Sequence, residues 1–249
     1  MMIKNGLIIF LLAIGIVLFA QPEDKTNSQN KLVFEGSFEG DFNNPQWVNK
    51  WGIAWNSRAD ECSIVSDAAD GDKALQVFYP EGSVGPDEGG AQFPIVFRNM
   101  QQNEGSGLYH ELYLRYYVKF EEGFDFQRGG KLPGLMGGGD SWARSGGHQP
   151  DGTNGWTLRL MWRQNRRLVV YAYVPPSENG KWGSETWGQD IDSGVDAETG
   201  EWMCIEQFVN VGNAGKDNGR LKVWIDGEEC ISINDMRFGD VENDDGKIG

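Results

Sequence analysis

The stretch GWTLRLMWRQNRRLVVYAYVPP, residues 155–176, decides the fold, because it holds two alternating apolar and polar segments separated by a short polar turn. Successive side chains of a β-strand point to opposite faces of the sheet. The apolar residues that share one face of these two predicted strands are Leu158, Leu160, Trp162, Val170, Ala172 and Val174. Each strand therefore has a core face and a more polar face.

The turn between these strands determines which polar residues become neighbours. Directly opposed residues of an antiparallel pair share a face of the sheet. A three-residue loop, residues 164–166, pairs Arg159 with Tyr171 and Thr157 with Tyr173. We therefore predict that a guanidinium, a hydroxyl and two phenols form one patch on the open face.

Short alternating segments bounded by Gly, Asn, Asp and Pro recur along the chain, and no long segment keeps a helical period. The predicted strands are residues 31–36, 62–66, 74–80, 92–97, 111–120, 157–163, 168–174, 203–211, 220–226 and 229–234. Asp226-Gly227, between the last two, is the strongest hairpin signal. We predict an all-β, jelly-roll β-sandwich with an open concave groove, and residues 129–147 as one long glycine-rich functional loop.

The N-terminus carries Lys4 and then an apolar run from Leu7 to Ala20. This run is too short to span a bilayer comfortably and is typical of the central region of a signal peptide. We expect cleavage near Ala20 and a secreted protein, extracellular or periplasmic, without a stable membrane partner; an uncleaved N-terminal anchor is the alternative. Residues 21–30 then form a polar linker and residues 31–249 one domain, which we expect to be monomeric.

The chain carries a formal charge of −15, which argues against nucleic acid and anionic membrane surfaces as partners. Residues 115–167 are the exception, because they hold nine lysines and arginines against five aspartates and glutamates. A basic segment in an acidic protein indicates a local anion site, with solvated surface charges as the alternative.

Cys62, Cys204 and Cys230 lack the spacing of a structural zinc site. In an oxidising compartment we expect either a disulfide between Cys204 and Cys230 or buried unpaired thiols. We predict no metal and no cofactor.

Two phenols, a guanidinium and a hydroxyl on one sheet face do not fit glycoside hydrolysis, which needs two carboxylates there. They fit β-elimination from a uronic acid. In that reaction a cation neutralises the substrate carboxylate, a base takes the proton from the adjacent carbon, and an acid protonates the departing glycosidic oxygen. Tyrosine can be base and acid, but a free phenol has a pKa of about 10, so nearby cations must lower it for work as a base near neutral pH.

Four separated segments resemble polysaccharide lyase family 14, the alginate lyases and related glucuronan lyases, and more loosely the fungal glucuronan lyases of family 20. The segments are RGGKLPGLMGG (128–138), TLRLMWR (157–163), VVYAYVPP (169–176) and IEQFVNVGNAGKDNGRLKVWIDG (205–227). They follow the family's order and spacing, and the resemblance covers most of residues 31–245. It implies a β-jelly roll with the polymer in an open groove, and eliminative cleavage without a metal ion.

The same resemblance implies roles for individual residues. The family's essential lysine corresponds to Lys131, its Ser-x-Arg pair to Thr157 and Arg159, and its Tyr-x-Tyr pair to Tyr171 and Tyr173. Lys131 and Arg159 would bind the carboxylate and Tyr171 would transfer protons. Thr157, which keeps the hydroxyl of the family's serine, and Tyr173 would position the sugar. Lys131 as the base, with a lowered pKa, is the competing assignment.

We expect further substrate contacts from Arg115, Arg163, Gln92 and His148. Members of the family usually continue beyond the equivalent of DDGKIG with another apolar strand, so we expect the chain to be truncated at its C-terminus.

These observations together predict a secreted lyase of an anionic polysaccharide, with alginate rich in mannuronate as the expected substrate and unsaturated uronate ends as the product. A glucuronan lyase of the same mechanism is one alternative. A noncatalytic carbohydrate-binding β-sandwich is the other, and it would keep the basic groove without needing Lys131 or both tyrosines.

Overall fold

The computed structural model describes residues 8–20, 31–36, 38, 45–67, 73–83, 85, 87–100, 107–138, 150–183, 188–240 and 247–248. Strands account for 49% of the chain and helices for 7%, which confirms the all-β prediction. Among the described residues, none of the helices combines the length and the apolar character needed to cross a bilayer.

The strands are β1 (Ile8–Ala20), β2 (Lys31–Glu35), β3 (Ser63–Val65), β4 (Ala74–Tyr79), β5 (Glu111–Phe120), β6 (Gly130–Gly137), β7 (Trp156–Trp162), β8 (Arg167–Tyr173), β9 (Gln189–Asp196), β10 (Trp202–Asn210), β11 (Gly219–Ile225) and β12 (Glu228–Met236). The helices are short: α1 (Pro45–Trp51), and the 3-10 turns η1 (Ala59–Glu61) and η2 (Phe97–Asn99).

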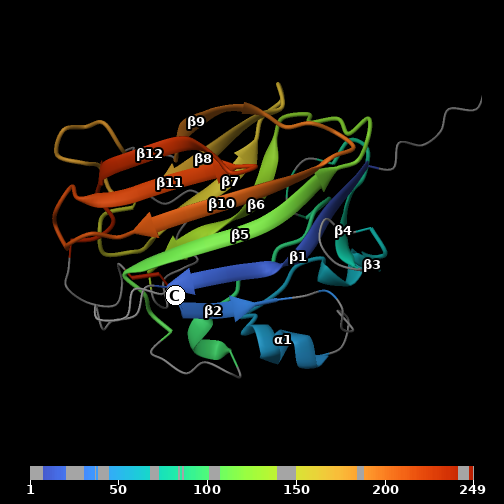
Figure 1. Ribbon diagram of the computed structural model, residues 1–249, viewed down its shortest axis with the longest axis horizontal. Coiled ribbons are helices and arrows are strands. Elements are labelled where there is room, and N and C mark those ends of the chain that lie inside the picture. Colours follow the sequence, from blue (N-terminus) through green and yellow to red (C-terminus); the bar gives the residue numbers. More distant parts are fainter. Residues whose placement is uncertain are drawn as a thin grey trace, which may run out of the picture.

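Two sheets form the sandwich (Figure 1). The large sheet has eight strands in the order β12-β11-β10-β5-β1-β4-β3, with β2 paired to β1, and the small sheet has the order β6-β7-β8-β9. Leu112 of β5 and Leu158 and Val170 of the small sheet all have 0% exposure and belong to one core cluster. Each sheet thus buries one face against the other and keeps an outer face.

The predicted register of β7 and β8 is confirmed. Arg159 opposes Tyr171, and Thr157 opposes Tyr173. Residues 163–166 connect the two strands. The Arg163 backbone N–H donates to the Arg167 carbonyl at 2.9 Å, so this pair closes the predicted three-residue loop, residues 164–166. The last loop residue, Arg166, adopts a left-handed conformation with φ of 69°.

The Asp226-Gly227 turn is also confirmed. It joins β11 to β12, and both residues have positive φ, 51° and 84°, as in a type I′ two-residue hairpin turn. The Cys204 backbone N–H donates to Asp226 Oδ1 at 2.7 Å, which ties the turn to β10.

Residues 92–97 are not a strand, contrary to the prediction. Gln92 and Ile95 form isolated bridges, and η2 begins at Phe97. Pro94 lies between the bridges and has no N–H to donate to a sheet. Conversely, β6 lies inside the glycine-rich stretch predicted as a loop, and β9 was not predicted at all.

The segment predicted as the centre of a signal peptide forms β1 in the intact chain. β1 lies between β4 and β5 and pairs with both, and also with β2. A run of Ile, Val, Leu and Phe suits an interior strand as well as a leader. A leader that is cleaved cannot stay in the sheet, so this arrangement describes the uncleaved chain, and cleavage stays a prediction.

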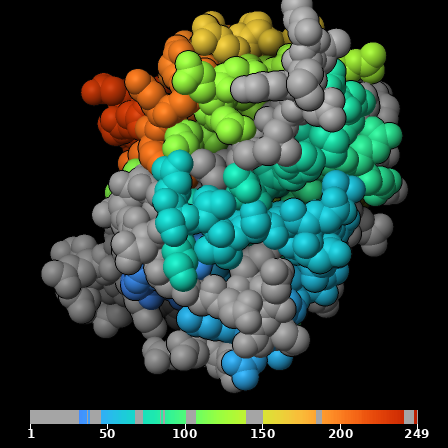
Figure 2. All heavy atoms as spheres, turned by 90° about the vertical axis from the view of Figure 1, so that its right-hand side faces the viewer, coloured from blue at the N-terminus to red at the C-terminus, as the bar shows by residue number. Residues whose placement is uncertain are grey.

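The segments from α1 to η2 lie together at one side of the molecule (Figure 2). Trp51 of α1 is 3% exposed and packs edge-on against Phe34 of β2, with 5.4 Å between ring centroids. Trp47 packs in the same way against Phe93, at 5.7 Å. The first contact attaches α1 to β2, and the second attaches α1 to the long connection between β4 and β5.

The three cysteines are free, so the expected disulfide between Cys204 and Cys230 is wrong. Of the unpaired thiols, Cys62 is buried as the alternative expected, whereas Cys204 and Cys230 are half-buried. Cys204 lies on β10 and Cys230 on β12, with β11 between them. Two strand spacings amount to about 10 Å, beyond the reach of a disulfide. Burial, reinforced by nearby acidic residues, raises the pKa of Cys62 to about 12, so this thiol is unreactive.

Candidate active site

The four polar residues predicted to share a face do so, on the outer face of the small sheet. Thr157 and Arg159 come from β7, and Tyr171 and Tyr173 from β8. Thr157 is only 1% exposed and Tyr173 only 3%, while the other two are half-buried. The patch is therefore an enclosed polar cluster and not a solvated surface.

Lys131 joins this patch from β6. In the register of β6 and β7, Lys131 opposes Met161 and Gly134 opposes Arg159. Opposed residues share a face, so the lysine lies on the outer face beside the guanidinium. We call the five residues together the outer-face cluster: Lys131, Thr157, Arg159, Tyr171 and Tyr173.

The strand order β6-β7-β8 places Lys131 and Tyr171 on either side of Arg159. Adjacent strands lie about 4.8 Å apart, so the backbones that carry the amine and the phenol are about 10 Å apart. Arg159 thus lies on the strand between the two strands that carry the amine and the phenol.

Two buried polar atoms of the cluster lack partners. Thr157 Oγ1 and Arg159 Nε have no hydrogen-bond partner in the part of the chain that the structure describes. Buried polar groups are nearly always paired in folded proteins, so such atoms side by side indicate a ligand position. A carboxylate is suited to both, because it accepts hydrogen bonds from a hydroxyl and from a guanidinium.

Tyr171 does not have the lowered pKa that we expected. Burial, the hydrogen bond with Tyr173 and the charge of Tyr173 raise the pKa of Tyr171 to about 12. The Arg163 guanidinium lowers this pKa and the Asp190 carboxylate raises it, both with smaller effects. The two tyrosine rings pack edge to face, 5.1 Å apart. Near neutral pH Tyr171 is a neutral phenol, which can donate a proton but is poorly prepared to accept one.

The pKa of Lys131 is shifted in the opposite direction. Partial burial of its amine lowers the pKa of Lys131, and the positive charge of Arg159 lowers it further. A lysine with a lowered pKa loses its proton more readily and can serve as a base. The cluster thus pairs a neutral acid with an amine prepared for deprotonation.

An ion pair that sequence reasoning missed lies beside Tyr171. Arg163 Nε donates to Asp190 Oδ2 at 2.9 Å, and a second guanidinium nitrogen donates to Oδ1 of the same carboxylate. The Arg163 guanidinium lies 5.2 Å from the centroid of the Tyr171 ring. Asp190 opposes Tyr171 in the register of β8 and β9. The only sequence signal for this strand was the alternation in QDIDSGVD, which its many polar residues make weak.

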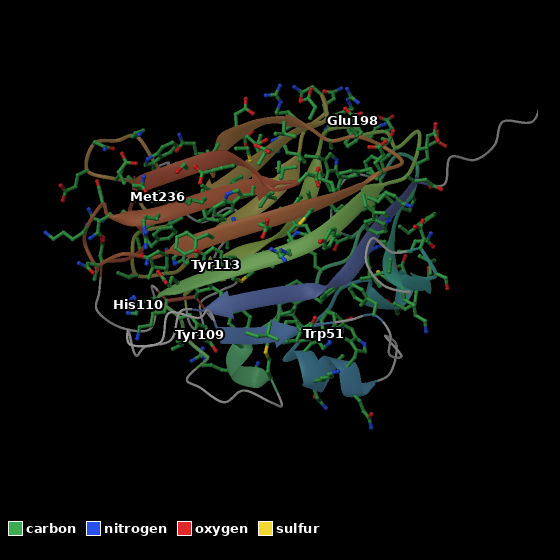
Figure 3. The ribbon with its side chains drawn as sticks, viewed as in Figure 1. Trp51, Tyr109, His110, Tyr113, Glu198 and Met236 are labelled. Atoms are coloured by element: carbon green, nitrogen blue, oxygen red, sulfur yellow. The ribbon has the colours of Figure 1, made fainter. Side chains whose placement is uncertain are left out.

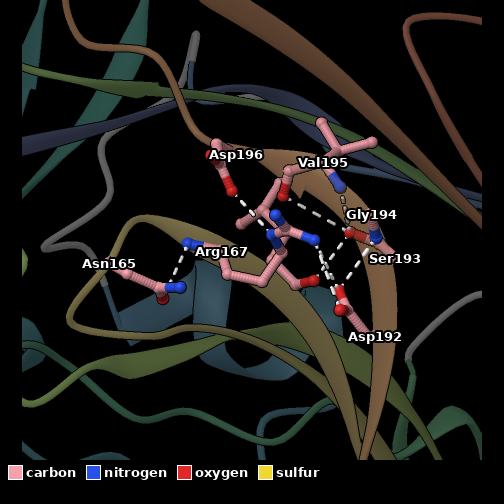
Figure 4. A network of polar contacts seen from close by, with 8 residues as sticks. Asn165, Arg167, Asp192, Ser193, Gly194, Val195 and Asp196 are labelled. Atoms are coloured by element: carbon pink, nitrogen blue, oxygen red, sulfur yellow. Dashed lines mark hydrogen bonds and ion pairs between the residues drawn. The ribbon is translucent and has the colours of Figure 1, made fainter.

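A second polar network attaches β9 to β8 (Figure 4). Arg167 pairs with Asp196 at 2.6 Å and with Asp192 at 3.1 Å, while Ser193 Oγ donates to the Leu168 carbonyl at 2.6 Å. Exposed ion pairs contribute little each, but together with the Ser193 hydrogen bond they secure the edge strand next to Tyr171.

Gly188, just before β9, fits closely against both tyrosine rings. A Cβ atom at this position would lie 2.7 Å from the Tyr173 ring and 2.8 Å from the Tyr171 ring. A larger residue would displace at least one ring, so glycine is required for the observed tyrosine pair.

The sequence profile of polysaccharide lyase 14 matches residues 67–248, which include the whole outer-face cluster. The chain belongs to polysaccharide lyase family 14. It is therefore a polysaccharide lyase, which decides against the noncatalytic alternative.

Solved structures agree with this assignment. A marine PL-14 alginate lyase from Aplysia kurodai is 29% identical, with a TM-score of 0.61 over 76% of each chain. An alginate lyase from Chlorella virus is 19% identical, with a TM-score of 0.62 over 80% of each chain, and shows the shared β-jelly-roll fold alone. A fungal endo-β-1,4-glucuronan lyase from Trichoderma reesei is 15% identical over 79% of this chain and 77% of its own, with a TM-score of 0.48, too distant to bear on activity. Curated protein sequences gave no significant match.

Arg115 does not lie in the outer-face cluster, contrary to our expectation that it contacts the substrate. It lies on the outer face of the large sheet, on the same face of β5 as Tyr113, whose ring is visible in Figure 3. Its guanidinium donates twice to Glu206 Oε1, at 2.9 and 2.6 Å. The alternation in β5 correctly identified a polar face, but it could not reveal which sheet the strand would join.

Gln92, another expected substrate contact, is not brought to the cluster. Gln92 exchanges backbone hydrogen bonds of 2.8 and 3.0 Å with Ser57, in the connection between β4 and β5. His148 lies outside the described residues of the lyase. Within the described ranges, no three His, Cys, Asp or Glu side chains are grouped as a metal site would require.

Replacing Asp190 in the lyase should lower the pKa of Tyr171. Asp190→Asn removes a negative charge that opposes ionisation of the phenol and leaves the positive charge of Arg163 uncompensated. The pKa is measured by NMR titration of ¹³C-labelled tyrosine, with the signal assigned by its loss in Tyr171→Phe. Asp196→Asn, which removes a carboxylate from the same strand, is the matched control and should leave the pKa unchanged. An equal or higher pKa in Asp190→Asn would contradict this electrostatic account.

Proposed function

We propose that this lyase cleaves a polyuronate, with mannuronate-rich alginate as the preferred substrate, by β-elimination without a metal ion. The observation that carries the proposal is the pair of buried, unpartnered donors on Thr157 and Arg159 between an amine and a phenol with opposite pKa shifts. The similarity to the Aplysia alginate lyase supports alginate as the polymer. Glucuronan, which offers the same carboxylate and glycosidic oxygen, is the alternative substrate.

Arg159 and Thr157 bind the uronate carboxylate. The guanidinium neutralises its charge, so the carbon beside the carboxylate becomes more acidic, and Thr157 Oγ1 donates the second hydrogen bond. Binding also satisfies the two buried polar atoms, which makes the carboxylate a better ligand than a neutral sugar group.

Lys131 is the base and Tyr171 is the acid in this mechanism. The Lys131 amine takes the proton from the carbon beside the carboxylate, and a carbon–carbon double bond forms as the bond to the glycosidic oxygen breaks. Tyr171 gives its proton to the departing oxygen, and Tyr173 orients the Tyr171 hydroxyl through their hydrogen bond. The step is redox-neutral, and its products are a new chain end and an unsaturated uronate.

The opposite pKa shifts favour one of the two assignments that the sequence left open. Tyr171 as sole base and acid would need a phenol with a lowered pKa, whereas burial raises it. Lys131 needs no further change, because its pKa is already lowered. The family resemblance supplied both candidates, and local electrostatics favour the lysine as the base.

Removing either proton-transfer group should nearly abolish turnover. Lys131→Ala and Tyr171→Phe should each lower kcat by about a hundredfold to ten-thousandfold, and Arg159→Ala should lower kcat/KM by about a hundredfold or more. The measurement is the ultraviolet absorbance of unsaturated ends formed from polymannuronate, polyguluronate and glucuronan, with a chelator present. Arg115→Ala, on the other sheet, is the matched control and should keep wild-type activity.

Full activity of Lys131→Ala or Tyr171→Phe would contradict the mechanism, and loss of wild-type activity in the chelator would contradict metal independence. Absence of product from the wild-type protein on all three polymers would contradict the substrate class.

The pH dependence follows from the two pKa shifts. The base must be deprotonated, so kcat/KM should rise as the pH passes the lowered pKa of Lys131 and then level off. The acid must be protonated, so activity should fall only as the pH approaches the Tyr171 pKa of about 12. If Tyr171 were the base, kcat/KM would instead keep rising toward that value with no earlier plateau.

We also propose that the lyase is secreted as a monomer after cleavage near Ala20. Signal-peptide features of residues 1–20 and an extracellular polymeric substrate support this proposal. Expression of the full chain in a secreting host should give a mature protein whose intact mass corresponds to a start at or near Gln21, and light scattering should give the mass of one chain. Recovery of the uncleaved chain in the membrane fraction would instead establish the anchor alternative.

A further inference from the structure

A β-bulge in β6 sets the direction of Lys131. Lys131 opposes Met161 and Gly134 opposes Arg159, so Leu132 and Pro133 together face only one residue of β7. Such an extra residue reverses the alternation of side chains along the strand.

This reversal is necessary for the active site. Leu132 and Leu135 are both buried in the core, at 4% and 5% exposure, although they are three residues apart. In a regular strand residue 131 would share the face of Leu135, and the lysine would point into the apolar core. The bulge allows both leucines to be buried while Lys131 points outward.

Gln207 reaches the bulge from the opposite sheet. Its side chain has 0% exposure and lies on the inner face of β10. Gln207 Oε1 accepts from the Leu135 backbone N–H at 2.8 Å, and Nε2 donates to the Leu158 carbonyl at 2.9 Å. One amide thus joins β6 to β7 directly behind the outer-face cluster.

Tyr116 holds the other side of the bulge. It lies on the inner face of β5, next to β10, and its hydroxyl donates to the Pro133 carbonyl at 3.1 Å. The residue has 0% exposure, and burial raises the pKa of Tyr116 well above its usual value, so the hydroxyl stays a donor. This hydrogen bond ties the backbone of the bulge to β5 across the core.

Gly134 shows how close β6 and β7 are at this point. A Cβ atom there would lie 2.2 Å from the Leu158 carbonyl oxygen and 2.5 Å from the Arg159 Cα. The backbone contact at Gly134 therefore fixes the position of Lys131 on β6 relative to Arg159 on β7. Any movement of the bulge changes the distance between the Lys131 amine and the Arg159 guanidinium.

We propose that Gln207 and Tyr116 are positioning residues of the active site, which hold the β6 bulge from across the core and so aim Lys131 at the substrate beside Arg159. The catalytic consequence rests on the proposed function. The positioning itself does not, because it concerns the geometry of the free protein. Neither residue touches the substrate in this arrangement.

The test uses Gln207→Met and Tyr116→Phe, which remove the hydrogen bonds but nearly keep side-chain volume. Ser193→Ala is the matched control, because it also removes a buried hydrogen bond to a backbone carbonyl of the small sheet, at its opposite edge. Unfolding midpoints of all three variants report general destabilisation. Tyr116→Phe loses a single hydrogen bond and is the milder variant if Gln207→Met does not fold.

The first measurement is the pKa of Lys131 in the free protein, by NMR of labelled lysine side chains, with the signal assigned by its loss in Lys131→Met. Both variants should move this pKa back toward the ordinary lysine value, because the amine moves away from Arg159 and into water. Ser193→Ala should keep the wild-type pKa. A wild-type pKa in a folded Tyr116→Phe or Gln207→Met protein would overturn the proposal.

The second measurement is steady-state kinetics on the polyuronate that the wild-type protein cleaves. Both variants should lower kcat by about tenfold to a hundredfold, since small displacements of a catalytic group have effects of this size, and KM should change by less than about threefold because carboxylate binding is kept. If the variants kept the wild-type kcat, the proposal that Gln207 and Tyr116 position Lys131 would also be overturned. If the wild-type protein cleaves no polyuronate, the proposed function fails, and the Lys131 pKa still decides whether the two residues position the lysine.

Discussion

Every strand of the small sheet must bury one face against the large sheet, and the outer-face cluster depends on this constraint. In β7 and β8 the buried alternation of Leu158, Leu160, Val170 and Ala172 forces the intervening polar residues outward. The three-residue turn then brings a guanidinium opposite a phenol. In β6 the same constraint acts through Leu132 and Leu135, and it can be met only with a bulge. Core packing therefore determines where each functional group points.

The outer-face cluster could be predicted where it depends on local pattern. The pairs of Arg159 with Tyr171 and of Thr157 with Tyr173 follow from a period of two residues and a turn length, both of which are visible in consecutive residues. The direction of Lys131 depends on Gln207, which lies far along the chain and across the core. No local pattern contains such a contact, and the glycines around Lys131 made β6 look like a loop. Family resemblance identified the lysine, but it did not supply the bulge.

A periodic sequence pattern also does not show which sheet a strand will join. The alternation of β5 gave the correct faces, yet its polar face lies on the outside of the large sheet, where Arg115 pairs with Glu206. Pairing between strands distant in sequence decides this, since β5 lies between β1 and β10. The same limitation concealed Asp190, because the strand that carries it is recognisable only when it pairs with β8.

The distribution of ion pairs explains how an acidic protein can present a site for an acidic polymer. Most described cations of the basic segment are already neutralised by carboxylates from other segments, as Arg163 is by Asp190, Arg166 by Glu198 and Arg167 by Asp192 and Asp196. Lys131 and Arg159 differ, because no carboxylate contributes to the pKa of either one. Long-range repulsion between the protein and a polyanion is screened beyond about 8 Å in physiological salt, whereas the uncompensated positive charge of the cluster acts at contact. An acidic surface therefore costs little affinity for a substrate carboxylate that reaches Lys131 and Arg159.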